Sequence, residues 1–250
     1  QGELEGYVMQ IASRQCLWRD TFAGPGTILA VEASSASMTV RIARGDLADD
    51  SDSVFVYWGD GQKSEYSRIS DARHTYEKPG EYTVRISDDL RTFGFTDSSP
   101  SGAVPERDML RELVSLGSKV TSIATYAFNN CHFMRGVMNL PNVTNIGGYA
   151  FGSTRGITDF ILPSMTRLVQ TSFYSGPTPT QMHADNVTEI DSRFWDYYGW
   201  KLYDLYLRNS TCAQIKAMSG FPFKADGTTE PVRFHGSDGI VLKDGTVIPN

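Results

Sequence analysis

The feature that most constrains the fold of this chain is a pattern that occurs four times between residues 120 and 209. The copies read VTSIATYAFNNCHFMRGVMNLP, NVTNIGGYAFGSTRGITDFILP, SMTRLVQTSFYSGPTPTQMHAD and NVTEIDSRFWDYYGWKLYDLYLRN. Three columns of mostly apolar residues keep a step of 22 or 23 residues: Val120, Val143, Met165 and Val187; Phe128, Phe151, Phe173 and Trp195; and Leu140, Leu162, Ala184 and Leu207. Such a period predicts a solenoid of stacked coils, because one copy cannot bury its own apolar face.

Each copy closes with a short alternating segment, which predicts a strand with one buried and one exposed face. We expect neighbouring strands of one parallel sheet at 136–140, 158–162, 180–184 and 203–207, with Met138, Phe160, Met182 and Leu205 inside. Their outward neighbours form two rows: Val137, Asp159, Gln181 and Asp204, then Asn139, Ile161, His183 and Tyr206. A fifth strand in PVRFH (231–235) would extend these rows with Arg233 and His235.

On this outer face we predict a contact patch for a partner, made of Asp159, Gln181, His183, Asp204 and Tyr206. Solenoids bind through such extended faces, which are rigid and carry side chains that the core does not need. A face that is merely solvated is the rival interpretation.

The repeat motifs resemble a known family. VTSIATYAFNNC and VTNIGGYAFGS, each followed by a strand that ends in Leu-Pro, are similar to the BspA-like leucine-rich repeats of bacterial surface proteins. The resemblance covers residues 119–209 and implies a leucine-rich-repeat solenoid. The third copy has Ser172-Phe173 in place of Ala-Phe, the fourth has Phe194-Trp195, and the repeat cysteine occurs only as Cys131.

Short alternating strands separated by turn signals occupy residues 27–90 and predict an antiparallel β-sandwich. The pair of motifs "W-GDG … HTY-x-x-PG-x-YTV" resembles the PKD (polycystic kidney disease) domain, which implies a seven-stranded sandwich. We expect Asp60 of the GDG turn to bond nearby backbone amides, and we favour a structural role over catalysis for Asp60 and His74.

Together, the repeat pattern and the short alternating strands predict a mainly β protein with two domains. The PKD-like sandwich spans 1–97 with its core at 27–90, a linker follows at 98–105 in the Ser- and Pro-rich stretch, and the repeat domain spans 106–250. A helix over 106–116 is expected to cap the solenoid, because Met109, Leu113 and Leu116 have helical spacing. A β-hairpin at 239–248, turning at Asp244-Gly245, is expected to cap the other end. Ser210 or Thr211 is expected to cap a short helix that runs to Met218.

The composition and charge of the chain restrict the classes of function that we expect. Residues 1–97 carry the chain's whole net charge of −6, and residues 98–250 have equal numbers of acidic and basic side chains. The sequence thus has no basic stripe of the kind that binds nucleic acid, and we do not expect nucleic-acid binding. No apolar run approaches the roughly 18 residues of a membrane span. The chain begins at Gln1 and has no apolar signal core, so we expect it to be a mature or recombinant fragment whose targeting segment was removed.

Metal chemistry is not expected either. Cys16, Cys131 and Cys212 form no ligand spacing with the four histidines and are expected to be buried free thiols. The acidic loop with Asp46, Asp49, Asp50 and Asp52 lacks the glycine and distal glutamate of a calcium loop.

The chain contains no GxSxG, P-loop, HExxH or complete GxGxxG motif. We therefore predict no enzyme, no cofactor and no metal. The expected function is that of a monomeric, extracellular or cell-surface binding and adhesion module, with the sandwich as spacer and the repeat sheet contacting a host or bacterial surface protein or glycan. The alternative is a polysaccharide-binding accessory region of a larger secreted enzyme. The seven aromatic residues between 194 and 206 either fill the last coil or form an exposed binding cluster.

Overall fold

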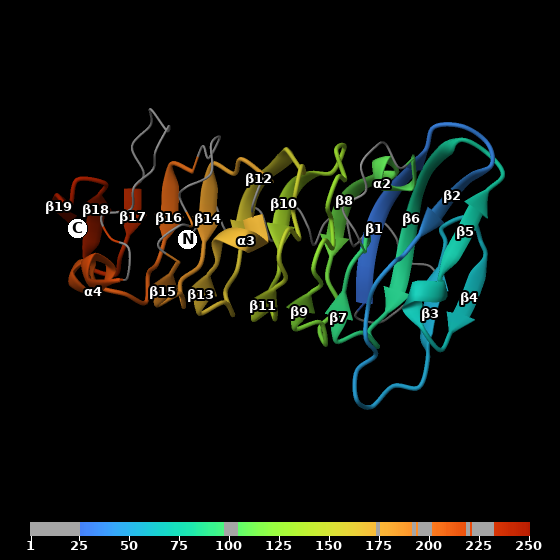
Figure 1. Cartoon of the computed structure of the whole chain (residues 1–250), viewed down its shortest axis with the longest axis horizontal. Coiled ribbons are helices and arrows are strands. Elements are labelled where there is room, and N and C mark those ends of the chain that lie inside the picture. Colours follow the sequence, from blue (N-terminus) through green and yellow to red (C-terminus); the bar gives the residue numbers. More distant parts are fainter. Residues whose placement is uncertain are drawn as a thin grey trace.

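A computed structural model shows an elongated, mainly β molecule with a sheet unit at one end and a solenoid along the rest (Figure 1). The structure describes residues 26–97, 105–173, 176–191, 194, 202–218, 221 and 233–250. The linker residues 98–104, Cys16 and the aromatic residues Trp195, Tyr197, Tyr198 and Trp200 lie outside the described residues.

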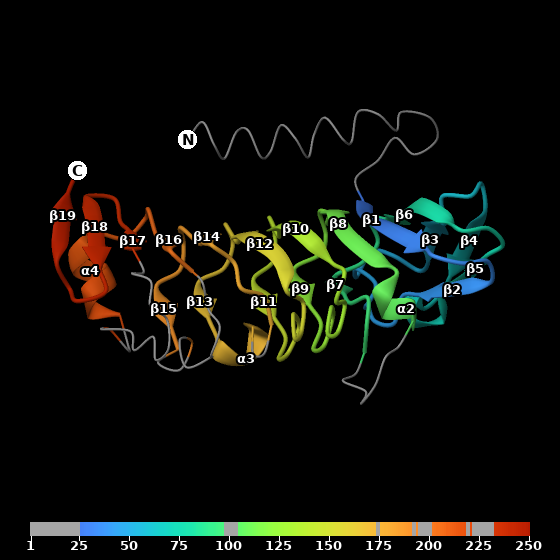
Figure 2. The same cartoon turned by 90° about the horizontal axis from the view of Figure 1, so that it is seen from above.

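The sheet unit consists of an antiparallel sheet with a smaller sheet on one side of it (Figure 2). The larger sheet has the order β4-β3-β6-β1-β8, with bounds Lys63–Tyr66, Val54–Tyr57, Gly80–Ser87, Gly26–Ala33 and Leu110–Ser115. The smaller sheet pairs β2 (Met38–Arg41) with β5 (Arg73–Tyr76), and a single turn of 3-10 helix, η1 (Ile69–Asp71), precedes β5. Strand alternation places Leu29, Val31, Val84 and Ile86 in the core between the sheets.

The GDG turn is held by side chains on the neighbouring strands. Asp60 accepts a hydrogen bond from the backbone N of Gln62 at 3.1 Å, as predicted, and pairs with His74 Nε2 at 2.7 Å. The His74 ring stacks on Trp58, whose backbone oxygen accepts the hydroxyl of buried Tyr76 at 2.8 Å. Gly59 has φ +89°, and a Cβ there would meet the Thr83 backbone at 2.8 Å, so the turn requires glycine. The pair between Asp60 and His74 therefore fixes a turn.

The predicted repeats form coils with two strands each. The long strands make one sheet: β10 (Arg135–Asn139), β12 (Gly156–Ile161), β14 (Gln181–His183), β16 (Asp204–Tyr206) and β17 (Arg233–His235). These strands pair in parallel and in sequence order, which confirms the predicted repeat register and adds the fifth strand. Short strands line a second side of the coils (Figure 1): β7 (Thr92–Phe93), β9 (Ser122–Ile123), β11 (Asn145–Ile146), β13 (Arg167–Leu168) and β15 (Glu189–Ile190).

Aromatic rings fill the centre of the coils. Phe151 is fully buried and stacks between Phe128 at 5.4 Å and Phe173 at 5.8 Å, with Phe160 edge-on. Phe194 continues this column at 5.7 Å from Phe173, whereas the repeat spacing predicts Trp195 at that position. In the third copy the turn folds into a short helix, α3 (Gln170–Phe173), which ends at the Phe173 of this column.

The predicted capping helix over 106–116 is wrong. Helix α2 covers only Pro105–Asp108, and β8 follows as a strand paired antiparallel with β1. Two register irregularities interrupt this pairing, and the buried residues of β8 consequently fall three apart, at Leu110 and Leu113. A bulged strand therefore produced the spacing that indicated a helix.

Strands of the two units interleave across the predicted linker. β7 precedes 98–104 in the chain but pairs with β9 of the solenoid, and β8 follows it but pairs with β1 of the sheet unit. β8 also lies beside β10, so the large sheet of the first unit is followed directly by the long sheet of the solenoid (Figure 2). The hydrophobic core is consequently continuous through both units.

At the far end, β18 (Gly239–Leu242) and β19 (Val247–Pro249) form an antiparallel hairpin after β17. Helix α4 (Cys212–Ala217) packs beside it and begins with a capping box, in which the Thr211 hydroxyl accepts from Gln214 N and the Gln214 side chain accepts from Thr211 N. The hairpin and helix together cover the last coil (Figure 1).

Candidate functional site

The outer face of the parallel sheet carries the two rows of side chains expected from the alternation. Register partners across the strands are Val137, Asp159, Gln181, Asp204 and Arg233 in one row, and Asn139, Ile161, His183, Tyr206 and His235 in the other. The inward residues Met138, Phe160, Met182 and Leu205 are at most 1 % exposed. The five predicted contact residues therefore share one face.

Three of the rings in the second row stack into a ladder, formed by His183, Tyr206 and His235 on strands β14, β16 and β17. The ring centroids of His183 and Tyr206 are 4.2 Å apart with an interplanar angle of 3°, and those of Tyr206 and His235 are 4.3 Å apart at 18°. The Arg208 guanidinium lies 4.8 Å from the centre of the Tyr206 ring. In-register pairing places the rings at these distances, since neighbouring strands lie about 4.8 Å apart.

The ladder presents ring edges because both faces of Tyr206 are covered by imidazoles. A sugar ring therefore has no open face of Tyr206 on which to stack. A partner would meet the tyrosine hydroxyl and the imidazole edges, which are polar and held at fixed spacing.

Asp204 lies beside the ladder at the centre of an ion-pair network. Its Oδ1 is 2.6 Å from His235 Nε2 and 2.7 Å from Arg233 Nε, and its Oδ2 accepts from Arg233 Nη2 at 2.7 Å. Burial opposes ionisation of Asp204, but the hydrogen bonds from Arg233 and His235 outweigh this effect, and the net shift lowers its pKa. The bidentate pair with Arg233 locks the strand β16 to β17.

His183 is held in the neutral form. Burial, aided by the positive charge of Arg208, lowers the pKa of His183 to about 4. Its Nδ1 is buried and has no hydrogen-bond partner among the residues that the structure describes. At neutral pH the ladder therefore contains an uncharged imidazole at this position.

The predicted contact residues differ in how freely they face solvent. Gln181, His183 and Tyr206 are partly exposed, whereas Asp159 is 8 % and Asp204 7 % exposed. Asp159 accepts from the Thr158 hydroxyl at 2.7 Å, and Asp204 is occupied by Arg233 and His235. Of the five predicted contact residues, Gln181, His183 and Tyr206 are therefore the more accessible, whereas the two carboxylates are largely buried and bonded to neighbouring side chains.

Several other groups that the sequence singled out have structural roles. Asp49 pairs with Arg91 at 3.0 Å and Asp50 with Lys119 at 2.9 Å, so these two of the four loop carboxylates form ion pairs. Cys131 and Cys212 are buried free thiols. Within the described ranges, no group of three or more His, Cys, Asp or Glu could hold a metal ion. No helix among the described residues is long and apolar enough to cross a membrane.

Fold and site together define a β-solenoid protein with a polar ring ladder on its parallel sheet. Residues 110–218 match the family model described as BspA type leucine rich repeat region (6 copies). The solenoid region is thus similar to BspA-type leucine-rich repeats, in agreement with the motifs of the first two copies. No curated protein and no solved structure was found to match the chain.

Proposed function

We propose that this chain is a non-catalytic, extracellular binding module whose parallel sheet contacts a partner through its outer face. The observation that carries the proposal is the His183–Tyr206–His235 ladder with its Asp204–Arg233 support. These polar side chains are ordered by the sheet register and by each other, and none of them is needed to fill the core. Preorganised groups of this kind lose little conformational entropy on binding.

The partner class that fits best is a protein at a host or bacterial cell surface. Ring edges, a hydroxyl and the Gln181 amide offer hydrogen bonds to a polar surface, and the covered faces of Tyr206 disfavour sugar stacking. The similarity to BspA-type repeats supports a role at the cell surface. In this proposal the sheet unit, with the motifs of a PKD-like sandwich, serves as a spacer fixed to the solenoid by β8.

The proposal is tested by screening the full chain against arrays of purified extracellular proteins and of glycans. We expect saturable binding to a protein that is lost when Tyr206 and His183 are replaced by alanine. Binding restricted to long polysaccharides would favour the accessory region of a secreted enzyme instead.

A further inference from the structure

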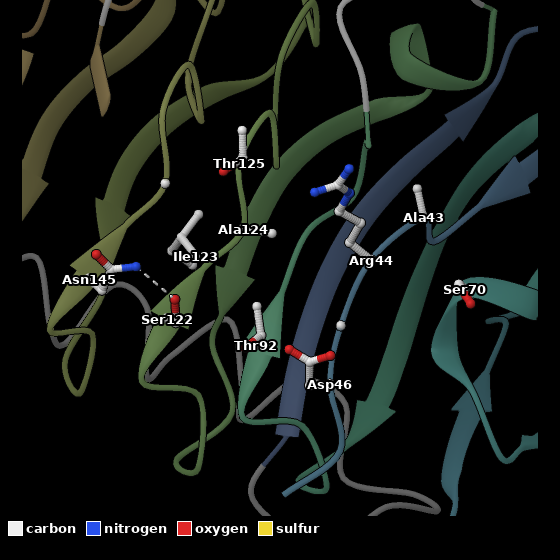
Figure 3. A pocket seen from close by; sticks show the side chains of 12 residues that line it. Ala43, Arg44, Asp46, Ser70, Thr92, Ser122, Ile123, Ala124, Thr125 and Asn145 are labelled. Atoms are coloured by element: carbon white, nitrogen blue, oxygen red, sulfur yellow. Dashed lines mark hydrogen bonds between the residues drawn. The ribbon is translucent and has the colours of Figure 1, made fainter. Parts of the chain in front are cut away.

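A polar pocket lies at the junction of the two units, away from the outer face of the parallel sheet (Figure 3). Its volume is about 510 Å³, within the range of small-ligand sites. Five parts of the chain line it: the segment 43–46, Ser70 of η1, Thr92 of β7, β9 with the turn that follows it, and β11 with the turn that follows it.

The floor of the pocket is the outward face of the three-stranded sheet β7, β9 and β11. Thr92, Ser122 and Asn145 are register partners on this sheet, and they alternate with the buried Phe93 and Ile123. Asn145 Nδ2 donates to Ser122 Oγ at 3.1 Å, as the dashed line in Figure 3 shows. Two hydroxyls and an amide therefore stand in a row, and Ser70 and Thr125 add two further hydroxyls at the rim.

One wall carries two charged groups, Arg44 and Asp46, which extend toward this sheet in Figure 3. Their backbone is fixed: Arg44 and Gly94 exchange two backbone hydrogen bonds of 3.0 Å, and the Asp46 oxygen accepts from Arg91 N at 2.9 Å. A Cβ on Gly45 would lie 2.7 Å from the Thr92 oxygen, so glycine lets this segment press against β7. Within the described part of the chain, neither the Arg44 guanidinium nor the Asp46 carboxylate has a hydrogen-bond or ion-pair partner.

We propose that this pocket binds a neutral hexose unit of a glycan. The Asp46 carboxylate accepts hydrogen bonds from two vicinal hydroxyls, and the Arg44 guanidinium donates to hydroxyl or ring oxygens. Hydrogen bonds to charged groups are roughly twice as strong as neutral ones, so these two side chains dominate the affinity. The row of Thr92, Ser122 and Asn145 contacts the remaining hydroxyls.

The charged and uncharged polar groups of the lining together favour a neutral sugar over other ligand classes. The charges of Arg44 and Asp46 cancel, so the lining favours neither an anion nor a cation. A zwitterionic amino acid would use the two charges but leave the hydroxyls and the amide without ligand contacts. A peptide side chain would find little apolar surface, because the apolar residues of the lining are two alanines and Ile123, and Ile123 is itself buried in the core. A polyol uses every polar group.

Saturation-transfer difference NMR and calorimetry on the full chain test the proposal with glucose, galactose, mannose, N-acetylglucosamine, glucuronate and glutamate. We expect saturable binding of at least one neutral sugar, weakened about tenfold or more by Arg44→Gln and by Asp46→Asn. Arg68→Gln and Asp71→Asn provide matched controls, because both residues are exposed near η1 but do not line the pocket. Tyr206→Ala should leave sugar binding unchanged, which separates this site from the sheet face.

Three results would overturn the assignment: no saturable binding of any neutral sugar, sugar binding that survives both pocket substitutions, or a preference for glutamate that Arg44→Gln abolishes. The last of these would assign the pocket to amino acids instead. Failure of the sheet-face proposal would not affect these measurements.

Discussion

At the residue scale, Phe151 tests the packing of the coils. Its ring is fully buried between two other phenylalanines, so Phe151→Ala should leave a cavity that the rigid stack cannot close. We expect a loss of about 3–5 kcal/mol in the free energy of unfolding, measured by urea denaturation. Phe133→Ala is the control, because Phe133 is 56 % exposed and its ring lies 4.8 Å from the Arg111 guanidinium. A loss below about 1 kcal/mol at Phe151 would contradict the repeat register.

The environment of His183 predicts how its titration, and with it the stability of the chain, depends on pH. Because its pKa in the folded chain is lowered to about 4, its NMR titration midpoint should lie far below the ordinary value of about 6.5. The unfolded chain then binds a proton that the folded chain does not, so the contribution of His183 to stability is present above about pH 6.5 and is lost as pH falls toward 4. His183→Asn should remove this part of the pH dependence. A midpoint near 6.5 would show that the imidazole is not desolvated in the ladder.

Residue patterns located the sheet-face rows but not the partners of their members. Alternation was sufficient to place His183, Tyr206 and Asp204 outward, because the side-chain period of a strand is two. The predicted fifth strand placed Arg233 and His235 next in these rows, but alternation could not show that both side chains bond to the Asp204 carboxylate, because it gives the face of a side chain and not its hydrogen bonds. Alternation could not predict the junction pocket either, because its groups come from five separate segments that the pairing of β7, β9 and β11 helps to bring together.

At the element scale, the start of α4 offers a local test. Thr211 and Gln214 satisfy each other's backbone amides, and Cys212 and Ile215 are the buried residues of the helix that Thr211 caps. Thr211→Ala should therefore cost about 1 kcal/mol of unfolding free energy, measured by thermal or urea denaturation. Thr211→Ser should be close to neutral, because the hydroxyl remains. Equal losses in both variants would show that the cap does not stabilise the end of the solenoid.

The element that sequence reasoning assigned wrongly was β8. Its acidic, proline-containing start and its apolar spacing fit a helix, and α2 does form one turn there. Tertiary context then prevails: the exposed edge of β1 offers hydrogen bonds for a partner strand, and bulges let Leu110 and Leu113 both point into the core. The spacing of apolar residues in one segment cannot reveal a β-bulge, because a bulge depends on the strand with which that segment pairs.

At the scale of the whole molecule, interleaved strands predict that the two units unfold together. β7 and β8 each pair with the other unit's strands, and one hydrophobic core runs through both. Hydrogen exchange should therefore report a common opening free energy for amides of β6 in the sheet unit and β12 in the solenoid. Leu113→Ala should lower both by the same amount. Separate transitions for the two strands would mean that the junction is a linker without energetic coupling.

The central claim is that the outer face of the parallel sheet contacts a surface partner. Its most direct test is the affinity of the full chain for the protein selected on the array, compared between wild type, His183→Ala and Tyr206→Ala at equal melting temperature. Arg167→Gln is the control, because Arg167 is exposed on the short-strand side of the coils. We predict that both ladder variants bind at least about tenfold more weakly and that the control binds normally. Normal binding by both ladder variants, with loss on substitution of Trp195, Trp200 or the sheet unit, would contradict the claim.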